Sequence, residues 1–248
     1  MTFVDVHAHL DFFSEEELVR SIAACERYAV IVVCNGVHPE SNMKVLALAK
    51  RFPRVQAALG FYPTHVNEYS DEDFARECTR IRSAKPKALG ETGLDYKEVT
   101  DPIQVERMKR WFITFIHLGK ELNIPLIVHS RKAELDVIDL LETHHAQKVI
   151  MHCFSGKKHL VERIQKNGWQ FSIPCIVEYL QQFQDIVKST PITQLLTETD
   201  APYLSPVKGE RNEPANVRLT VQKIAELKGM TLEEVEKNIF MNYQRLFL

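Results

Sequence analysis

The chain has 248 residues, of which 45% are apolar and 26% charged, and its 31 basic and 33 acidic side chains give a formal charge of −2 at pH 7. These values exclude collagen-like, disordered and disulfide-scaffold chains, and the near-neutral charge argues against binding of nucleic acid through a broad basic face. The size suits one large domain or two small ones, and is about what a closed barrel of eight strand and helix pairs requires.

We expect neither a targeting segment nor a membrane-spanning segment. Residues 1–10 contain one acid and two histidines, with no basic segment and no apolar stretch of signal-peptide length. The longest purely apolar run, residues 29–34, is far below the roughly 18 residues that a membrane-spanning helix needs. We therefore expect a cytoplasmic protein without membrane contact, and the five scattered cysteines predict reduced thiols.

Short apolar runs predict eight strands. They end near Val6, Cys34, Leu59, Leu89, Val128, Met151, Ser172 and Leu196. The seven intervals between the first end and the last average about 27 residues, the length of one strand, one helix and two short loops. Several runs, such as residues 30–33, lack polar alternation, which is typical of parallel strands buried on both faces.

Helix signals fill the intervals. Capping boxes or an Asp-Pro pair mark three helix starts, at Ser14 with Glu17, at Asp101 with Pro102, and at Thr231 with Glu234. No linker or repeat interrupts the alternation, so we predict one α/β domain over residues 1–248, a (β/α)8 TIM barrel. An open doubly wound sheet would use the same alternation and is the alternative.

Asp5, His7 and His9 alternate with apolar residues at the end of the first run. In an extended chain their side chains point to one side, and two imidazoles at this spacing can hold one divalent ion. Polar residues that only hydrogen-bond one another at a barrel mouth would give the same pattern. The pair alone therefore does not decide between the two interpretations.

Later runs supply further potential ligands, which follow four of the predicted strands: Glu91, His129, His152 and Asp200. In a parallel barrel the carboxyl ends of all strands open on one face. Together with His7 and His9 they make six ligands, more than one tetrahedral ion uses, which predicts two ions and a bridging carboxylate, Glu91. A metal-free polar cluster is the alternative.

The chemistry of these donors also favours cations. Placing Glu91, Asp200 and Asp5 close together would raise at least one carboxyl pKa sharply unless cations neutralised the charge. The nitrogen and oxygen donors lack cysteine, which fits Mg, Mn, Zn or Co and selects none of them. We predict that Asp200, with Glu91, acts in catalysis by orienting or deprotonating water, and that Asp5 steadies His9 or a neighbouring ligand.

Six ordered motifs resemble those of the TatD family of metal-dependent deoxyribonucleases, a branch of the amidohydrolase-like barrels. The motifs are Asp-Val-His-Ala-His-Leu at 5–10, Gly-Glu-Thr-Gly-Leu-Asp-Tyr at 90–96, Val-His-Ser-Arg at 128–131, His-Cys-Phe-Ser-Gly at 152–156, Thr-Glu-Thr-Asp-Ala-Pro-Tyr-Leu at 197–204 and Arg-Asn-Glu-Pro at 211–214. The resemblance spans nearly the whole chain. It implies a (β/α)8 barrel, the same six metal residues, and hydrolysis of nucleic acid, above all DNA, with Mg or similar ions.

One stretch departs from the family pattern. Where the family often has histidine in a Gly-x-His-Pro context, this chain has Tyr62 between Phe61 and Pro63, with His65 two places beyond the proline. Tyrosine can hydrogen-bond a phosphate oxygen, but it binds metal or carries a proton near pH 7 less readily than imidazole. Whether His65 takes the missing role or is an ordinary loop residue stays open.

Substrate contacts are expected from loops at the same mouth. The candidates for phosphate contact are Tyr62, Arg131, Lys157 and Arg211, and Tyr96, Tyr203 and Phe154 would stack on bases if exposed. The leading prediction is an exonuclease-type deoxyribonuclease without an obligate protein partner. The alternatives are a metal-dependent hydrolase of another ester or amide, such as a small phosphoester or an aminoacyl-tRNA ester, and a non-catalytic nucleic-acid-binding protein.

Overall fold

The computed structural model describes residues 2–248. Its eight parallel strands form one sheet in sequence order: β1 (Phe3–Ala8), β2 (Val30–Asn35), β3 (Val55–Leu59), β4 (Ala88–Gly93), β5 (Leu126–His129), β6 (Val149–His152), β7 (Gln170–Ile173) and β8 (Leu195–Thr197). This order confirms the predicted (β/α)8 barrel and excludes the doubly wound alternative, in which the strand order reverses.

The barrel closes between β1 and the segment that follows β8. Ala8 and Ala201 form a parallel bridge, and the amide of His9 donates to the carbonyl oxygen of Ala201 across 2.7 Å. One residue earlier, the amide of Asp200 donates to the carbonyl oxygen of His7 across 2.8 Å. The first strand is therefore held against the last.

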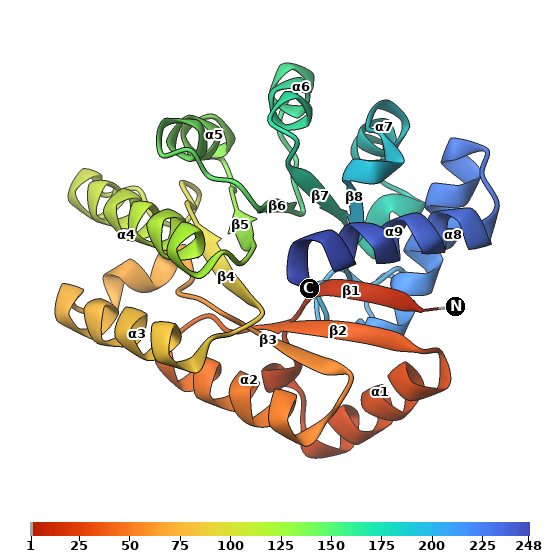
Figure 1. The fold of residues 1–248 in the computed structure, drawn as a ribbon, viewed down its shortest axis with the longest axis horizontal. Coiled ribbons are helices and arrows are strands. Elements are labelled where there is room, and N and C mark those ends of the chain that lie inside the picture. The colour runs from red at the N-terminus through yellow and green to blue at the C-terminus, as the bar shows by residue number, and fades with distance from the viewer. Residues whose placement is uncertain (1) are drawn as a thin grey trace.

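Helices surround the strands, as Figure 1 shows. They are α1 (Glu15–Arg27), α2 (Pro39–Arg51), α3 (Asp71–Ala84), α4 (Pro102–Leu122), α5 (Glu134–Thr143), α6 (Lys158–Lys166), α7 (Gln181–Ser189), α8 (Val217–Lys228) and α9 (Leu232–Phe247). The predicted capping boxes are present at Ser14 and Thr231, and the Asp101 side chain accepts from the Gln104 amide at the start of α4. Among the described residues, no helix has the length and apolar character to cross a membrane.

The two ends of the barrel differ. At the amino-terminal end, α9 packs against β1 and β8, and the Asn242 side chain donates to the carbonyl oxygens of Ile192 and Leu195, both across 2.8 Å. The carboxyl ends of the strands lie opposite and carry the polar side chains. Every residue of β1 and β4 is buried, including Asp5, His7 and Glu91. Burying polar groups costs free energy unless they are paired, so the buried polar side chains of β1 and β4 indicate a functional site.

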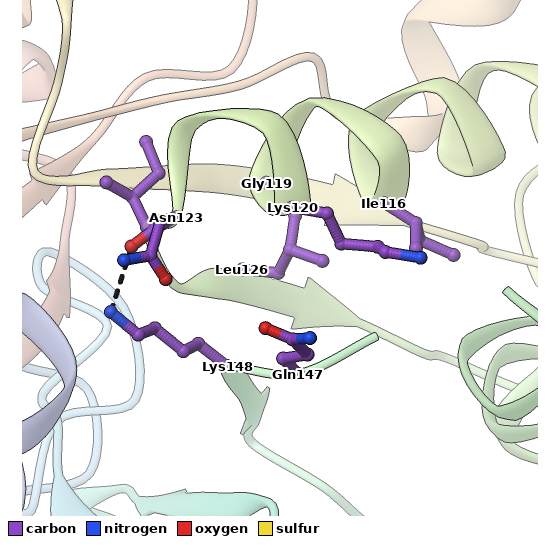
Figure 2. Close-up of a pocket in the computed structure, with 8 residues that line it drawn as sticks. Ile116, Gly119, Lys120, Asn123, Leu126, Gln147 and Lys148 are labelled. Atoms are coloured by element: carbon purple, nitrogen blue, oxygen red, sulfur yellow. Dashed lines mark hydrogen bonds between the residues drawn. The ribbon is translucent and has the colours of Figure 1, made fainter. Parts of the chain in front are cut away.

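A small pocket of about 10 Å³ lies near the amino-terminal end of the barrel, where α4 meets the starts of β5 and β6 (Figure 2). Lys148 donates there from its Nζ to the carbonyl oxygen of Asn123 across 2.9 Å. No carboxylate or imidazole is among its lining residues. The pocket therefore has none of the imidazole or carboxylate donors of a metal site.

Candidate metal centre

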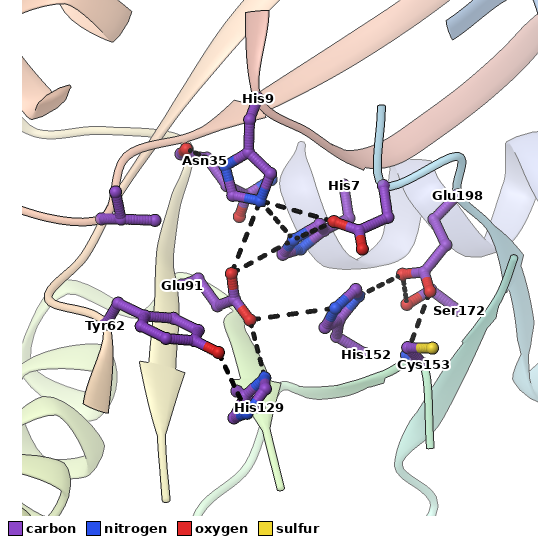
Figure 3. Close-up of polar contacts among 12 residues, drawn as sticks. His7, His9, Asn35, Tyr62, Glu91, His129, His152, Cys153, Ser172 and Glu198 are labelled. Atoms are coloured by element: carbon purple, nitrogen blue, oxygen red, sulfur yellow. Dashed lines mark hydrogen bonds and ion pairs between the residues drawn. The ribbon is translucent and has the colours of Figure 1, made fainter. Parts of the chain in front are cut away.

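The six predicted ligands come together at the carboxyl end of the barrel, and Figure 3 shows His7, His9, His129 and His152 around Glu91. His7 lies in β1, Glu91 in β4, and His129 and His152 are the last residues of β5 and β6. The other two, His9 and Asp200, lie in the segments that follow β1 and β8. Residues up to 193 positions apart thus share one pocket.

A first donor group consists of His7 Nε2, His9 Nε2, one oxygen of Glu91 and one of Asp200. The two Nε2 atoms are 3.1 Å apart. His7 Nε2 lies 3.4 Å from Glu91 Oε2 and from Asp200 Oδ1, and the corresponding distances from His9 Nε2 are 3.5 and 3.4 Å. Donors around a tetrahedral zinc-sized ion lie about 3.3 Å apart, since each bond is about 2.0 Å. The residues therefore fit one divalent cation.

A second donor group uses the other oxygen of Glu91. Glu91 Oε1 lies 2.9 Å from His129 Nδ1 and 3.8 Å from His152 Nε2. The carboxylate thus directs Oε2 to one pair of histidines and Oε1 to another (Figure 3). This is the arrangement in which one carboxylate can serve two cations.

Hydrogen bonds behind the rings orient three of the histidines. In each of these rings, the nitrogen that points away from the donor group faces an oxygen atom. His129 Nε2 lies 2.9 Å from Asp95 Oδ2, and His152 Nδ1 lies 2.8 Å from Glu198 Oε2. His9 Nδ1 lies 2.9 Å from the carbonyl oxygen of Asn35. An acceptor at the outward nitrogen holds the proton there and leaves the inward lone pair available for a cation. Sequence reasoning did not assign these acceptors, although Asp95 and Glu198 lie inside the motifs that carry Glu91 and Asp200.

His7 differs from the other histidines. Its Nδ1 is buried and has no hydrogen-bond partner within residues 2–248. The ring stacks on that of His152 with centroids 3.6 Å apart. Burial and the adjacent His152 both lower the pKa of His7, which favours the neutral ring and the lone pair that coordination needs.

Charge in the metal-free pocket is divided between carboxylates and imidazoles. Burial opposes ionisation of Glu91, but His7, His129 and His9 hold its pKa well below the usual range. Burial likewise opposes protonation of His152, but Glu198 outweighs it and raises the pKa of His152 to about 9. Protons on imidazoles therefore balance the carboxylates, a role that cations can take over.

Asp5 ties together the two segments that carry the candidate ligands His7 and Asp200. Its Oδ1 accepts from the amides of His7 and Thr199 across 3.2 and 3.0 Å, and its Oδ2 accepts from the Thr199 hydroxyl. Burial raises the pKa of Asp5 well above its usual value, against the opposing hydrogen bonds from Thr199. The contact is therefore with the backbone of one candidate ligand, His7, while the ring of His9 is held by the carbonyl oxygen of Asn35.

Tyr62 reaches the edge of the second donor group. Its hydroxyl lies 3.4 Å from both Asp95 Oδ2 and His129 Nε2. Burial raises its pKa, so the phenol stays protonated and can donate a hydrogen bond. His65, in contrast, pairs through Nδ1 with Glu68 Oε2 at 3.0 Å and stands on edge to the Tyr62 ring. Within residues 2–248, no hydrogen bond or ion pair joins its side chain to the donor groups.

The other predicted substrate contacts lie on loops at the same end of the barrel. Arg131 pairs weakly with Glu98 at 3.4 Å, and Lys157 is exposed at the residue before α6. Arg211 pairs with Glu17 at 3.0 Å. Among the aromatic candidates, Phe154 is buried and the Tyr96 hydroxyl donates to Asp136 across 2.6 Å, whereas Tyr203 is exposed.

Known proteins resemble this chain over its whole length. In sequence, it is 34% identical to the uncharacterized metal-dependent hydrolase YabD of Bacillus subtilis, over 98% of both chains. It is 33% identical to the deoxyribonuclease TATDN3 of Homo sapiens, over 98% of this chain and 94% of the human protein. It is also 32% identical to the uncharacterized metal-dependent hydrolase MJ1582 of Methanocaldococcus jannaschii, over 99% and 96%.

A solved structure shares the fold. The TatD homologue YJJV of Escherichia coli K12 superposes with a TM-score of 0.89 at 26% identity, covering 99% of this chain and 97% of that one. The sequence model of the family described as TatD related DNase matches residues 4–248. The chain therefore belongs to the TatD family of metal-dependent hydrolases.

Proposed function

We propose that this protein is a deoxyribonuclease that hydrolyses phosphodiester bonds and releases nucleotides from DNA ends. The observation that carries the proposal is the pair of donor groups that share Glu91, one oxygen to each group. The name of the human relative, a deoxyribonuclease, supports the choice of substrate. The few basic side chains on the loops at this end of the barrel could contact a few successive phosphates.

Two divalent cations fit the donor groups. The first would be held by His7, His9, Glu91 and Asp200, and the second by Glu91, His129 and His152. When bound, such cations lower the pKa of water and offset the negative charge that develops on the phosphate oxygens. The residues that orient the imidazoles, Asp95 and Glu198, would keep the donors aimed inward.

Side chains at the carboxyl end of the barrel would accept the proton and contact the phosphates. Asp200 lies at the first donor group, and its carboxylate would orient the attacking water or accept its proton. Tyr62 would donate its hydroxyl proton in a hydrogen bond to a phosphate oxygen. Arg131, beside the second donor group in sequence, would bind a neighbouring phosphate.

A direct test compares substrates on the metal-loaded protein. Single-stranded DNA, RNA of the same sequence and p-nitrophenyl phosphate are each incubated with protein loaded with Mg²⁺, Mn²⁺ or Zn²⁺. We expect mononucleotides from DNA, and no product from the Glu91→Gln variant, which replaces the shared carboxylate. Turnover of the small phosphoester alone would favour the other hydrolase function, and DNA binding without turnover would favour the non-catalytic alternative.

A further inference from the structure

Two aromatic rings remain exposed beside the first donor group. Phe12 ends the short helix η1 (Leu10–Phe12) directly after β1, and Tyr203 lies in the segment that follows β8. Their exposed fractions are 40% and 54%. Aromatic rings of this size are usually covered, because leaving them in water forgoes a large hydrophobic gain. Their exposure next to candidate ligands therefore needs an explanation.

The rings are arranged around His9. The ring of Phe12 lies nearly parallel to that of His9, with centroids 5.3 Å apart and planes at 17°. The ring of Tyr203 stands on edge to both, with centroids 6.3 Å from His9 and 6.5 Å from Phe12. Together Phe12 and Tyr203 form an apolar corner beside His9, whose Nε2 belongs to the first donor group. The Phe12 ring is nearly parallel to the His9 ring, and the Tyr203 ring is steeply inclined to it.

Backbone contacts hold this corner in place. The amide of Tyr203 donates to the carbonyl oxygen of Asp200 across 2.8 Å, so the ring is tied to the segment that carries a candidate ligand. The guanidinium of Arg211 donates to the carbonyl oxygen of Phe12 across 3.3 Å. Hydrogen bonds to the backbone of Phe12 and of Tyr203 thus hold both residues of the corner.

We infer that Phe12 and Tyr203 bind the nucleobase next to the bond that is cut, by stacking on Phe12 and edge contact with Tyr203. This inference rests on the proposed function, which places a phosphate at the donor groups. Only the ring of His9 separates Phe12 from the first of these groups. A nucleobase is planar and apolar on its faces, and stacking on aromatic side chains tolerates any of the bases. A base inside a duplex has both faces covered, so the corner accepts the base of a terminal or unpaired nucleotide.

Two single-stranded oligonucleotides test the inference. They share one sequence, but in the second the terminal nucleotide at the digested end is abasic. We expect kcat/KM of the metal-loaded wild type to be about tenfold higher for the intact end. Phe12→Leu and Tyr203→Leu keep apolar volume and remove the aromatic ring, so they should lower kcat/KM for the intact end and leave the abasic end unchanged. Met241→Ala, at an exposed position on α9, is the control.

A binding measurement separates stacking from catalysis. An oligonucleotide with 2-aminopurine at the same terminus and a hydrolysis-resistant phosphorothioate linkage should lose fluorescence on binding the wild type. The loss should be smaller with Phe12→Leu and unchanged with Met241→Ala. Metal content, measured in parallel, should be the same in all three proteins.

The possible failures are distinguishable. Equal kcat/KM of the wild type for both ends, or leucine variants that slow both substrates alike, would overturn the stacking subsite while the deoxyribonuclease proposal stands. If the metal-loaded wild type cut neither oligonucleotide, the proposed function and the subsite would both be overturned.

Discussion

The backbone amide of Asp200 donates a hydrogen bond to the carbonyl oxygen of His7 across 2.8 Å. The same pair meets again through side chains, because Asp200 Oδ1 lies 3.4 Å from His7 Nε2. Asp5 reinforces the junction through the amides of His7 and Thr199. The contacts that close the barrel therefore also bring His7 and Asp200 together in the first donor group.

Removing the charge of Asp200 should slow turnover strongly with little effect on folding. Asp200 has φ +56°, and asparagine adopts this left-handed conformation about as readily as aspartate, so Asp200→Asn avoids new backbone strain. Loss of a proton acceptor typically costs about 10²- to 10⁴-fold in rate. We expect kcat to fall by at least about 100-fold while the thermal midpoint changes little. Asp185→Asn, on the exposed side of α7, should keep full activity, and equal kcat in both variants would refute the role of Asp200.

The pair of His152 and Glu198 predicts how stability depends on pH in metal-free protein. The pKa of His152 is raised from its usual 6.5 to about 9, so the folded state binds this proton more tightly than the unfolded state. The stabilisation is fully present below pH 6.5 and is lost as the pH rises to about 9. Because one pKa unit is worth about 1.4 kcal/mol, the loss is roughly 3 kcal/mol.

Replacing Glu198 isolates this contribution. Glu198→Gln keeps the size of the side chain but removes the charge that raises the pKa of His152. Urea unfolding of chelator-treated protein at pH 6.5 and pH 9 should show a smaller fall in the free energy of unfolding for the variant than for the wild type. Identical falls in the two proteins would show that this pair does not hold the proton.

Gly60 keeps β3 and β4 close enough to place Glu91. A Cβ atom at Gly60 would lie 2.4 Å from the carbonyl oxygen of Glu91 and 2.4 Å from the carbonyl carbon of Gly90, closer than packed atoms approach. Gly60→Ala should therefore displace Glu91, lowering the free energy of unfolding by about 1–3 kcal/mol and weakening metal binding in titration calorimetry. Gly119→Ala, whose Cβ would meet only the side chain of Leu126, should retain wild-type metal affinity.

Arg131 should act on substrate binding rather than on the chemical step. Its guanidinium is half exposed at the mouth and makes only a long contact of 3.4 Å with Glu98. Arg131→Ala should raise KM for DNA about fivefold, leave kcat within about twofold and reduce the salt dependence of binding, because one phosphate contact is lost. Arg76→Ala, which removes an exposed arginine from α3, should leave KM unchanged. A drop in kcat at constant KM would assign Arg131 to catalysis instead.

The fold and the central cluster could be predicted from the sequence because both follow from periodic rules. Apolar runs at regular intervals predict parallel strands, and the carboxyl ends of such strands meet on one face. Glu91, His129 and His152 could therefore be grouped although they come from three separate strands. The strand ends were less predictable: Glu91 lies inside β4, not beyond it.

Contacts made by loops could not be predicted in the same way. Nothing in the spacing of Asp95 and His129, 34 residues apart, shows that the two side chains meet at 2.9 Å. Arg211 is expected from sequence to face substrate, yet its guanidinium pairs with Glu17 at the start of α1. Phe12 carries no pattern of its own, and only its exposure beside His9 points to a role.

Metal content in the wild type and in Glu91→Gln tests the central hypothesis most directly, namely that one carboxylate serves two cations. Both proteins are loaded with Mn²⁺, freed of excess ion and analysed by mass spectrometry, with Glu98→Gln as the exposed control. We predict two ions per chain in the wild type and the control, and at most one in Glu91→Gln, together with loss of turnover. Two ions and full turnover in Glu91→Gln, or full activity of the wild type after exhaustive chelation, would contradict it.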